Sequence, residues 1–129
     1  MLLNQTIMKP PLIFVVDDDL RLSQVLCSLL RRAGYQAESF GDGVSALRAF
    51  SEHPPDLALL DVVLPDITGI EILRRIRARS AVLPVVMMSG ERSIQVAAEA
   101  VSLGASDFLE KPLDVHRLRA TIRNALEGV

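Results

Sequence analysis

The sequence predicts an α/β domain in which helices cover both faces of a parallel sheet. Short apolar runs alternate with helical patterns along the chain, which predicts five strands that alternate with five helices. The runs at residues 57–60 and 83–88 are apolar almost throughout. Such runs are typical of strands buried on both faces, which is the situation in a parallel sheet whose crossover helices pack on each side.

The first strand is expected at residues 12–16, and a helical pattern follows at 20–33. Gly34 comes directly after that pattern, where a left-handed helix cap favours glycine. Apolar residues recur in the helix at i, i+3, i+4 spacing, which predicts one buried stripe. The expected stripe comprises Leu22, Val25, Leu26, Leu29 and Leu30.

The rest of the chain repeats this alternation. Pro54 and Pro55 stop the second helix, because proline cannot continue one, and Gly104 follows the fourth. Further strands are expected at 35–40, 57–60, 83–88 and 107–109, and further helices at 44–50 and from about Glu91 to Leu103. One face of the last helix comprises Leu118, Ile122 and Leu126.

Composition narrows the classes of function. The chain has 129 residues, enough for one domain with a proper core. Its formal net charge of -2 leaves no basic excess to hold nucleic acid or an acidic membrane. Cys27 is the single cysteine, so no intrachain disulfide can form, which fits a reducing compartment. We expect a cytoplasmic domain that binds neither nucleic acid nor membrane.

Three carboxylates, Asp17, Asp18 and Asp19, directly follow the first strand. A nucleotide-binding fold would carry glycines there, because phosphate must approach backbone amides. Clustered acids repel a bare phosphate, so they favour a site for a hard metal ion. The alternative is that all three are solvated loop acids at a helix start, and we expect Asp19 to cap the next helix.

Asp61 ends the third strand, so it leaves the sheet at the same carboxyl edge as those acids. That edge is where open α/β sheets bind ligands. Ser89 ends the fourth strand, and Lys111 follows the last one with a side chain long enough to reach inward. Each residue alone would be an ordinary turn, helix-start or exposed residue. Their convergence at one edge is what favours a site.

The segments VVDDD, LLDVVLPDITG, MMSGE and GASDFLEKP, in this order and at these spacings, resemble the signature of receiver domains of two-component response regulators. The resemblance runs from about Leu12 to Leu126. It implies a flavodoxin-like doubly wound sheet of order 2-1-3-4-5 with five helices. It also implies a receiver domain at residues 12–127, after a disordered or extended segment at 1–11.

The resemblance implies a role for each acid of the site. Asp61 would be the phosphoacceptor, and it would share an ion of Mg²⁺ or Mn²⁺ with neighbouring ligands. Asp18 would bind the ion directly and Asp17 largely through water. The backbone carbonyl of Val63 would be a further ligand.

The remaining implied roles concern the phosphoryl oxygens and the switch. Ser89 and Lys111 would contact the phosphoryl oxygens, and Ser89 with Phe108 would form the switch. The bond between Lys111 and Pro112 is one that the family holds in cis. Phe108 departs from many members, which carry Tyr there, so a hydroxyl contact with a partner is absent.

The implied partner is a sensor histidine kinase or a phosphotransfer protein, with no enzymatic turnover by this chain. The output, expected to be transcription, would be controlled through the fourth helix, fifth strand and fifth helix, a face that could also form a homodimer. A stand-alone receiver in a phosphorelay is an alternative. A flavodoxin-like electron carrier is disfavoured by the acids after strand one, and an aspartate-nucleophile phosphatase by Val63, where a second acid is wanted.

Overall fold

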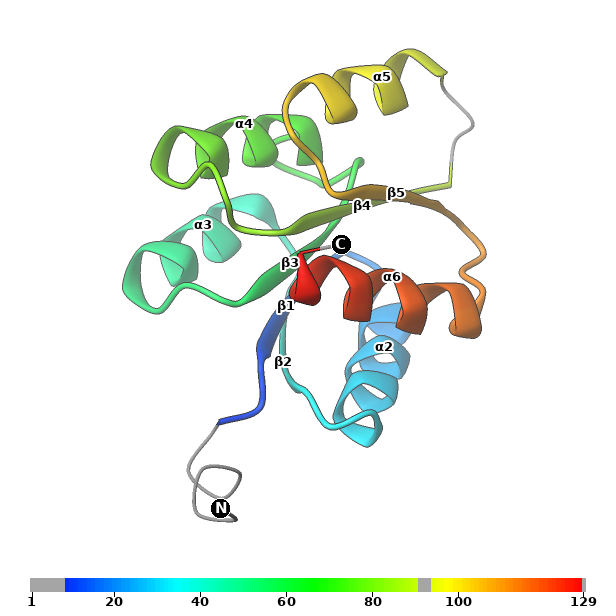
Figure 1. Cartoon of the computed structure of the whole chain (residues 1–129). Helices are drawn as coiled ribbons and strands as arrows, with labels where there is room; N and C mark the ends of the chain where they lie inside the picture. Colours follow the sequence, from blue (N-terminus) through cyan, green and yellow to red (C-terminus); the bar gives the residue numbers. More distant parts are fainter. Residues whose placement is uncertain (1–8, 91–93, 129) are drawn as a thin grey trace.

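In a computed structural model, the chain folds into a five-stranded parallel sheet with helices on both faces (Figure 1). The structure describes residues 9–90 and 94–128. The strand order is β2-β1-β3-β4-β5. The α/β class, the parallel sheet and the order 2-1-3-4-5 are therefore confirmed. The strands are β1 (Leu12–Val16), β2 (Gln36–Phe40), β3 (Leu57–Asp61), β4 (Val85–Ser89) and β5 (Asp107–Glu110), and the helices are α2 (Leu20–Arg32), α3 (Gly43–Glu52), α4 (Gly69–Arg79), α5 (Ile94–Ser102) and α6 (Val115–Glu127).

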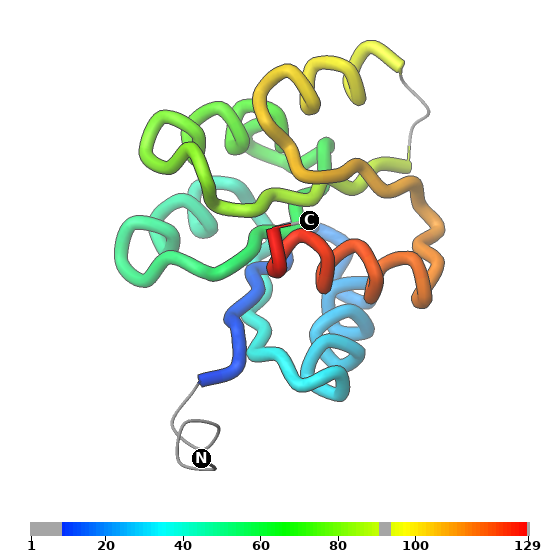
Figure 2. The backbone as a smooth tube through the Cα atoms, in the orientation of Figure 1, coloured from blue at the N-terminus to red at the C-terminus, as the bar shows by residue number. Residues whose placement is uncertain are grey.

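The helices divide into two layers. Helices α2 and α6 lie on one face of the sheet, and α3, α4 and α5 lie on the other (Figures 1 and 2). Successive side chains of a strand point to opposite faces. Accordingly, Ile13 and Val15 of β1 pack in the core beneath α2 and α6, whereas Phe14 and Val16 pack beneath the other three helices. Both faces of the sheet are thus buried beneath helices, which explains the unbroken apolar run in β3.

Helix α2 begins and ends as its sequence predicts. Asp19 is the N-cap and its side chain accepts a hydrogen bond from the backbone N–H of Leu22 at 3.1 Å. Gly34 has a φ of 98°, the left-handed conformation that glycine adopts without strain. Both ends of the helix are therefore set by local chemistry.

The predicted stripe of α2 was partly wrong. Val25 is 55% exposed, and Leu22 and Leu29 are only half-buried. The buried positions are Ser23, Leu26, Cys27 and Leu30. The stripe is rotated because Ser23 turns inward and donates its hydroxyl to the carbonyl of Asp17 at 3.3 Å, so a polar residue takes a core position.

The other element boundaries follow the predictions closely. Strands β3, β4 and β5 each end one residue later than predicted, so that Asp61 and Ser89 are the last residues of their strands. In α6, Leu118 and Ile122 are buried and Leu126 packs against them. The predicted start of the fourth helix at Glu91 lies outside the described residues, as does most of the predicted segment 1–11. No helix in the described ranges is long and apolar enough to cross a membrane.

Candidate functional site

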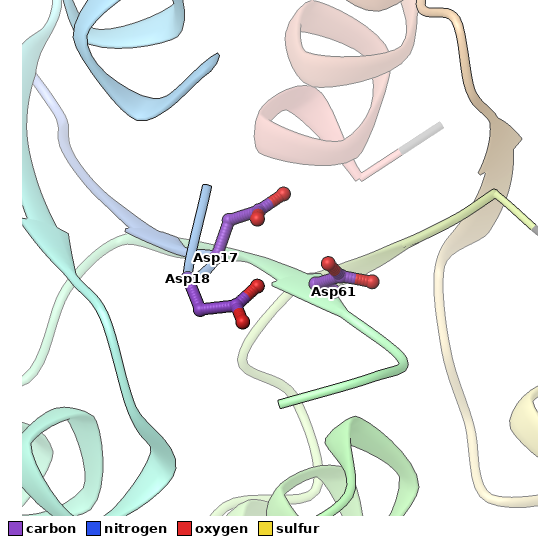
Figure 3. Close-up of side chains that lie close together, drawn as sticks. All are labelled: Asp17, Asp18 and Asp61. Carbon is purple, nitrogen blue, oxygen red and sulfur yellow. The ribbon is translucent and has the colours of Figure 1, made fainter. Parts of the chain in front are cut away.

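Three carboxylates meet at the carboxyl edge of the sheet. Asp61 is the last residue of β3, and Asp17 and Asp18 directly follow β1, its neighbour in the sheet. Each offers an oxygen, and these oxygens all lie within 4.8 Å of one another. Figure 3 shows the side chains approaching one another from the ends of the two strands. Parallel pairing brings them together, because it places both strand ends on one edge.

Burial differs among the three acids. Asp17 and Asp61 are only 1% and 6% exposed, whereas Asp18 is exposed. The backbone N–H of Asp17 donates to the carbonyl of Phe40 at 3.0 Å, which extends the pairing with β2 and fixes the turn. A carboxylate buried to this degree is rare unless it is paired.

Lys111 supplies the pairing cation. Its Nζ donates to Asp17 Oδ2 at 2.6 Å and to Asp61 Oδ2 at 2.9 Å. The side chain reaches these acids from the end of β5, where its backbone N–H donates to the carbonyl of Ser89 at 2.8 Å. The peptide bond from Lys111 to Pro112 is cis. One ammonium group is therefore shared by two buried carboxylates.

Burial and the shared hydrogen bonds shift the pKa values of Asp61 and Lys111. Burial raises the pKa of Asp61, and the charge of Asp17 adds to the rise, while hydrogen bonds from Lys111 and the Val63 amide oppose it. Burial by itself would lower the pKa of Lys111, but its hydrogen bonds to Asp17 and Asp61 outweigh that effect and raise the pKa overall. The cluster holds its lysine charged and still carries more negative than positive charge.

This donor set fits a hard divalent cation. Three carboxylates converge, and Lys111 offsets only part of their charge. Carboxylate oxygens of this kind are the ligands that Mg²⁺ and Mn²⁺ prefer. Val63 lies beside them, since its backbone N–H donates to Asp61 Oδ1 at 3.1 Å, and its side chain is 58% exposed.

Ser89 and Phe108 occupy the neighbouring strands. Ser89 ends β4 and is buried, one residue beyond Met88, which pairs with Asp61. Phe108 lies on β5, paired with Met87, and is half-buried against the core beneath α3, α4 and α5. The structure thus places Ser89 at the end of the strand next to that of Asp61, and Phe108 one strand further out.

Two residues of the site were missed by reasoning from the sequence. Asp66, in the loop after β3, accepts hydrogen bonds from the backbone N–H groups of Gly43 at 2.9 Å and Val44 at 2.8 Å. Gly69, the first residue of α4, lies against the end of β3, and a Cβ there would come 2.1 Å from the carbonyl oxygen of Asp61. No signal in the sequence indicates this close approach, because it depends on the direction of the Asp61 carbonyl in the folded chain.

Comparison with known proteins identifies a family model that matches most of the chain. A model described as the response regulator receiver domain matches residues 13–123. The transcriptional regulatory protein ZraR of Escherichia coli is 40% identical over 114 residues, covering 88% of this chain and 26% of that protein. The transcriptional regulatory protein FixJ of Bradyrhizobium diazoefficiens is 38% identical, covering 88% of this chain and 56% of that protein. The chain thus spans between about a quarter and about half of these relatives.

Solved structures show the same likeness. A CheY-like response regulator receiver domain protein from Methanospirillum hungatei superimposes with a TM-score of 0.89 at 25% identity, covering 93% of this chain and 96% of that one. NtrX from Brucella abortus gives a TM-score of 0.86 at 35% identity, covering 92% of this chain and 27% of that one. The likeness extends over nearly all of the fold described above.

Proposed function

Because this chain belongs to the response regulator receiver domain family, a family of signalling domains, we propose that Asp61 is its phosphoacceptor. The observation that carries the proposal is the contact of buried Asp61 with Lys111, beside the carboxylates of Asp17 and Asp18. A nucleophile, a cation and metal-ligand oxygens meet at one edge, which is the set that phosphoryl transfer to a carboxylate needs. A flavin carrier needs no such set of acids, and an aspartate-nucleophile phosphatase would want a second acid where this chain has Val63.

The proposed metal is Mg²⁺ or Mn²⁺, held by Asp17, Asp18, Asp61 and the backbone carbonyl of Val63. When bound, such an ion lets a carboxylate approach a negatively charged donor and stabilises charge on the transferring oxygens. The exposed carboxylate of Asp18 leaves the cluster open to solvent on one side, so an ion can enter without unfolding.

The reaction follows from the side chains of the site. An oxygen of the Asp61 carboxylate forms a bond to phosphorus as the bond from phosphorus to a donor histidine nitrogen breaks, and the imidazole leaves with that electron pair. Lys111 already contacts Asp61, so its ammonium is placed to contact the phosphoryl oxygens. The Ser89 hydroxyl, at the end of the adjacent strand, is the second proposed contact.

The proposed switch couples Ser89 to Phe108. Movement of Ser89 toward the phosphoryl group would vacate space that the Phe108 ring can enter, which biases the face formed by α5, β5 and α6. That face is also the proposed homodimer interface. The NMR signals of the Phe108 ring, and the sedimentation of the chain, should both change on phosphorylation. Unchanged ring signals would rule out this switch.

The proposed donor is the phosphohistidine of a sensor kinase or a phosphotransfer protein, in the cytoplasm. The relatives named above are transcriptional regulatory proteins, and we propose control of transcription as the output here, with a stand-alone role in a phosphorelay as the alternative. Transfer of a labelled phosphoryl group from a purified histidine kinase to this chain would test the donor class. Absence of transfer from every such kinase tried, alongside labelling by small donors, would argue against it.

The central experiment is intact-mass measurement after incubation with Mg²⁺ and a small-molecule phosphodonor. We expect the chain to gain one phosphoryl group, because Asp61 and Lys111 are already in place. A chelator added before the donor should prevent the gain, since the carboxylates would then repel the donor. No gain in the presence of Mg²⁺ would overturn the proposal.

Val63→Asn is expected to shorten the lifetime of the phosphorylated chain severalfold. Val63 has no polar group to orient a water molecule for attack on phosphorus, and an amide at this exposed position could do so. Decay of the phosphorylated form, followed by intact mass, measures the effect. Val82→Asn is the matched control, because Val82 is an 86% exposed valine in the turn before β4. Equal decay of Val63→Asn and the unmodified sequence would contradict the prediction.

A further inference from the structure

Asp66 connects two loops that are distant in the sequence. Its Oδ1 accepts a hydrogen bond from the backbone N–H of Gly43 at 2.9 Å, and its Oδ2 accepts one from Val44 at 2.8 Å. Those amides belong to the first turn of α3, which follows β2, whereas Asp66 follows β3. Strands β2 and β3 flank β1 in the sheet, so the two joined loops lie on either side of the end of β1, where Asp17 and Asp18 stand.

The first turn of α3 has a local cap of its own. Asp42 is the N-cap, and its Oδ1 accepts a hydrogen bond from the backbone N–H of Ser45 at 2.7 Å. Asp66 satisfies two further amides of the same turn from 22 and 23 residues away. Helix capping alone needs no such distant partner. The long-range bonds therefore add a constraint on the loop that carries Asp66.

That loop is closed at its base and packed at its tip. The backbone N–H of Gly69 donates to the carbonyl of Val62 at 2.8 Å, which closes the base beside Asp61. At the tip, Ile67 packs so closely on Gly43 that a Cβ on Gly43 would lie 2.4 Å from the Ile67 side chain. Residues 62–68 are thus held both at the base and at the tip of the loop, and Val63 lies within this loop, next to its base.

We infer that Asp66 is a positioning residue for the metal site, because it holds residues 62–68 against α3 and so fixes the backbone of Val63 beside Asp61. The inference rests on the proposed function, in which the Val63 carbonyl is a metal ligand. Hydrogen bonds from Gly43 and then Val44 lower the pKa of Asp66, because both bonds favour its charged form. Asp66 itself touches neither metal nor phosphoryl group.

The test compares Mg²⁺ affinity, by isothermal titration calorimetry, in Asp66→Ala, Asp66→Asn and Asp42→Ala. We expect Asp66→Ala to weaken Mg²⁺ binding about tenfold, as loss of an outer-shell support commonly does. Asp66→Asn keeps one acceptor oxygen and should lie between Asp66→Ala and the unmodified chain. Asp42→Ala removes a cap from the same helix without freeing the loop, so its Mg²⁺ affinity should stay within about twofold of the original.

A second measurement separates positioning from general stability. Thermal unfolding curves should show that Asp66→Ala and Asp42→Ala are both folded. In NMR spectra, only Asp66→Ala should shift the amide signal of Val63. Equal loss of Mg²⁺ affinity in the two variants, or none in Asp66→Ala, would overturn the inference and leave the proposed function standing. Absence of Mg²⁺ binding by the unmodified chain would overturn both.

Discussion

Asp61→Asn is expected to gain no phosphoryl group from a small-molecule donor in the presence of Mg²⁺. The amide has nearly the shape of the carboxylate but lacks its charge and its nucleophilic oxygen. Lys111 keeps its hydrogen bond to Asp17 at 2.6 Å, so the rest of the site should persist. Intact mass of the variant and the unmodified chain, incubated side by side, measures the result. Equal gain in the two proteins would exclude Asp61 as the acceptor.

The matched control is Asp56→Asn. Asp56 is an exposed aspartate at the opposite end of β3, where its Oδ2 accepts a hydrogen bond from the backbone N–H of Leu12 at 2.7 Å. This variant should be phosphorylated like the unmodified chain, because the substitution lies away from the acid cluster. Loss of phosphorylation in Asp56→Asn would show that a generally damaged fold is enough to prevent the reaction.

We expect Asp61→Asn to remain folded, so that its loss of phosphorylation is not due to unfolding. Burial raises the folded-state pKa of Asp61, so its ionisation favours the unfolded chain as pH rises from the unfolded-state pKa through the folded-state value. At neutral pH the ionised carboxylate therefore destabilises the fold, and a neutral amide should not lower the melting temperature. A thermal melt without metal checks this directly.

Gly69→Ala is expected to cause a severe loss of stability. The new Cβ would lie 2.1 Å from the carbonyl oxygen of Asp61 and 2.9 Å from its carbonyl carbon. These are backbone atoms of a buried strand, so neither can swing aside as a flexible side chain would. We expect the free energy of unfolding to fall by about 3 kcal/mol or more, measured by urea denaturation.

Gly41→Ala provides the control for this prediction. A Cβ at Gly41 would meet nothing within 4 Å, and the residue has no positive φ. Its free energy of unfolding should change by no more than about 0.5 kcal/mol, as for most surface substitutions. If Gly69→Ala unfolds at the same urea concentration as Gly41→Ala, the close approach of α4 to the end of β3 is wrong.

The fold was largely predictable because its signals are local. Strand β1 occupies the predicted residues 12–16, and Asp19 and Gly34 limit α2 as expected. The meeting of Asp17, Asp18 and Asp61 follows from one topological fact, that parallel strands end on the same edge. Residues far apart in sequence could therefore be brought together without knowledge of side-chain conformations.

The stripe of α2 that was predicted wrongly, and the two residues that were missed, depend on contacts that hydropathy does not encode. Val25 was expected in the core, but Ser23 takes an inward position through its hydrogen bond to Asp17. The partners of Asp66 are amides, which every residue except proline carries, so no residue type indicates them. The demand for glycine at position 69 arises from the direction of one carbonyl group, which only three-dimensional packing reveals.

Because Lys111 shares its ammonium group between two buried carboxylates, folding of the domain should not require the metal ion that phosphorylation requires. Because Lys111 is an internal counter-ion, the metal-free domain should remain folded, so a chelator should block phosphorylation while the chain still shows a cooperative thermal unfolding transition. The chain can thus wait, folded and unmodified, for a donor to arrive. In this unmodified state the three carboxylates outnumber the single ammonium group at the sheet edge, and this excess of negative charge attracts a divalent cation.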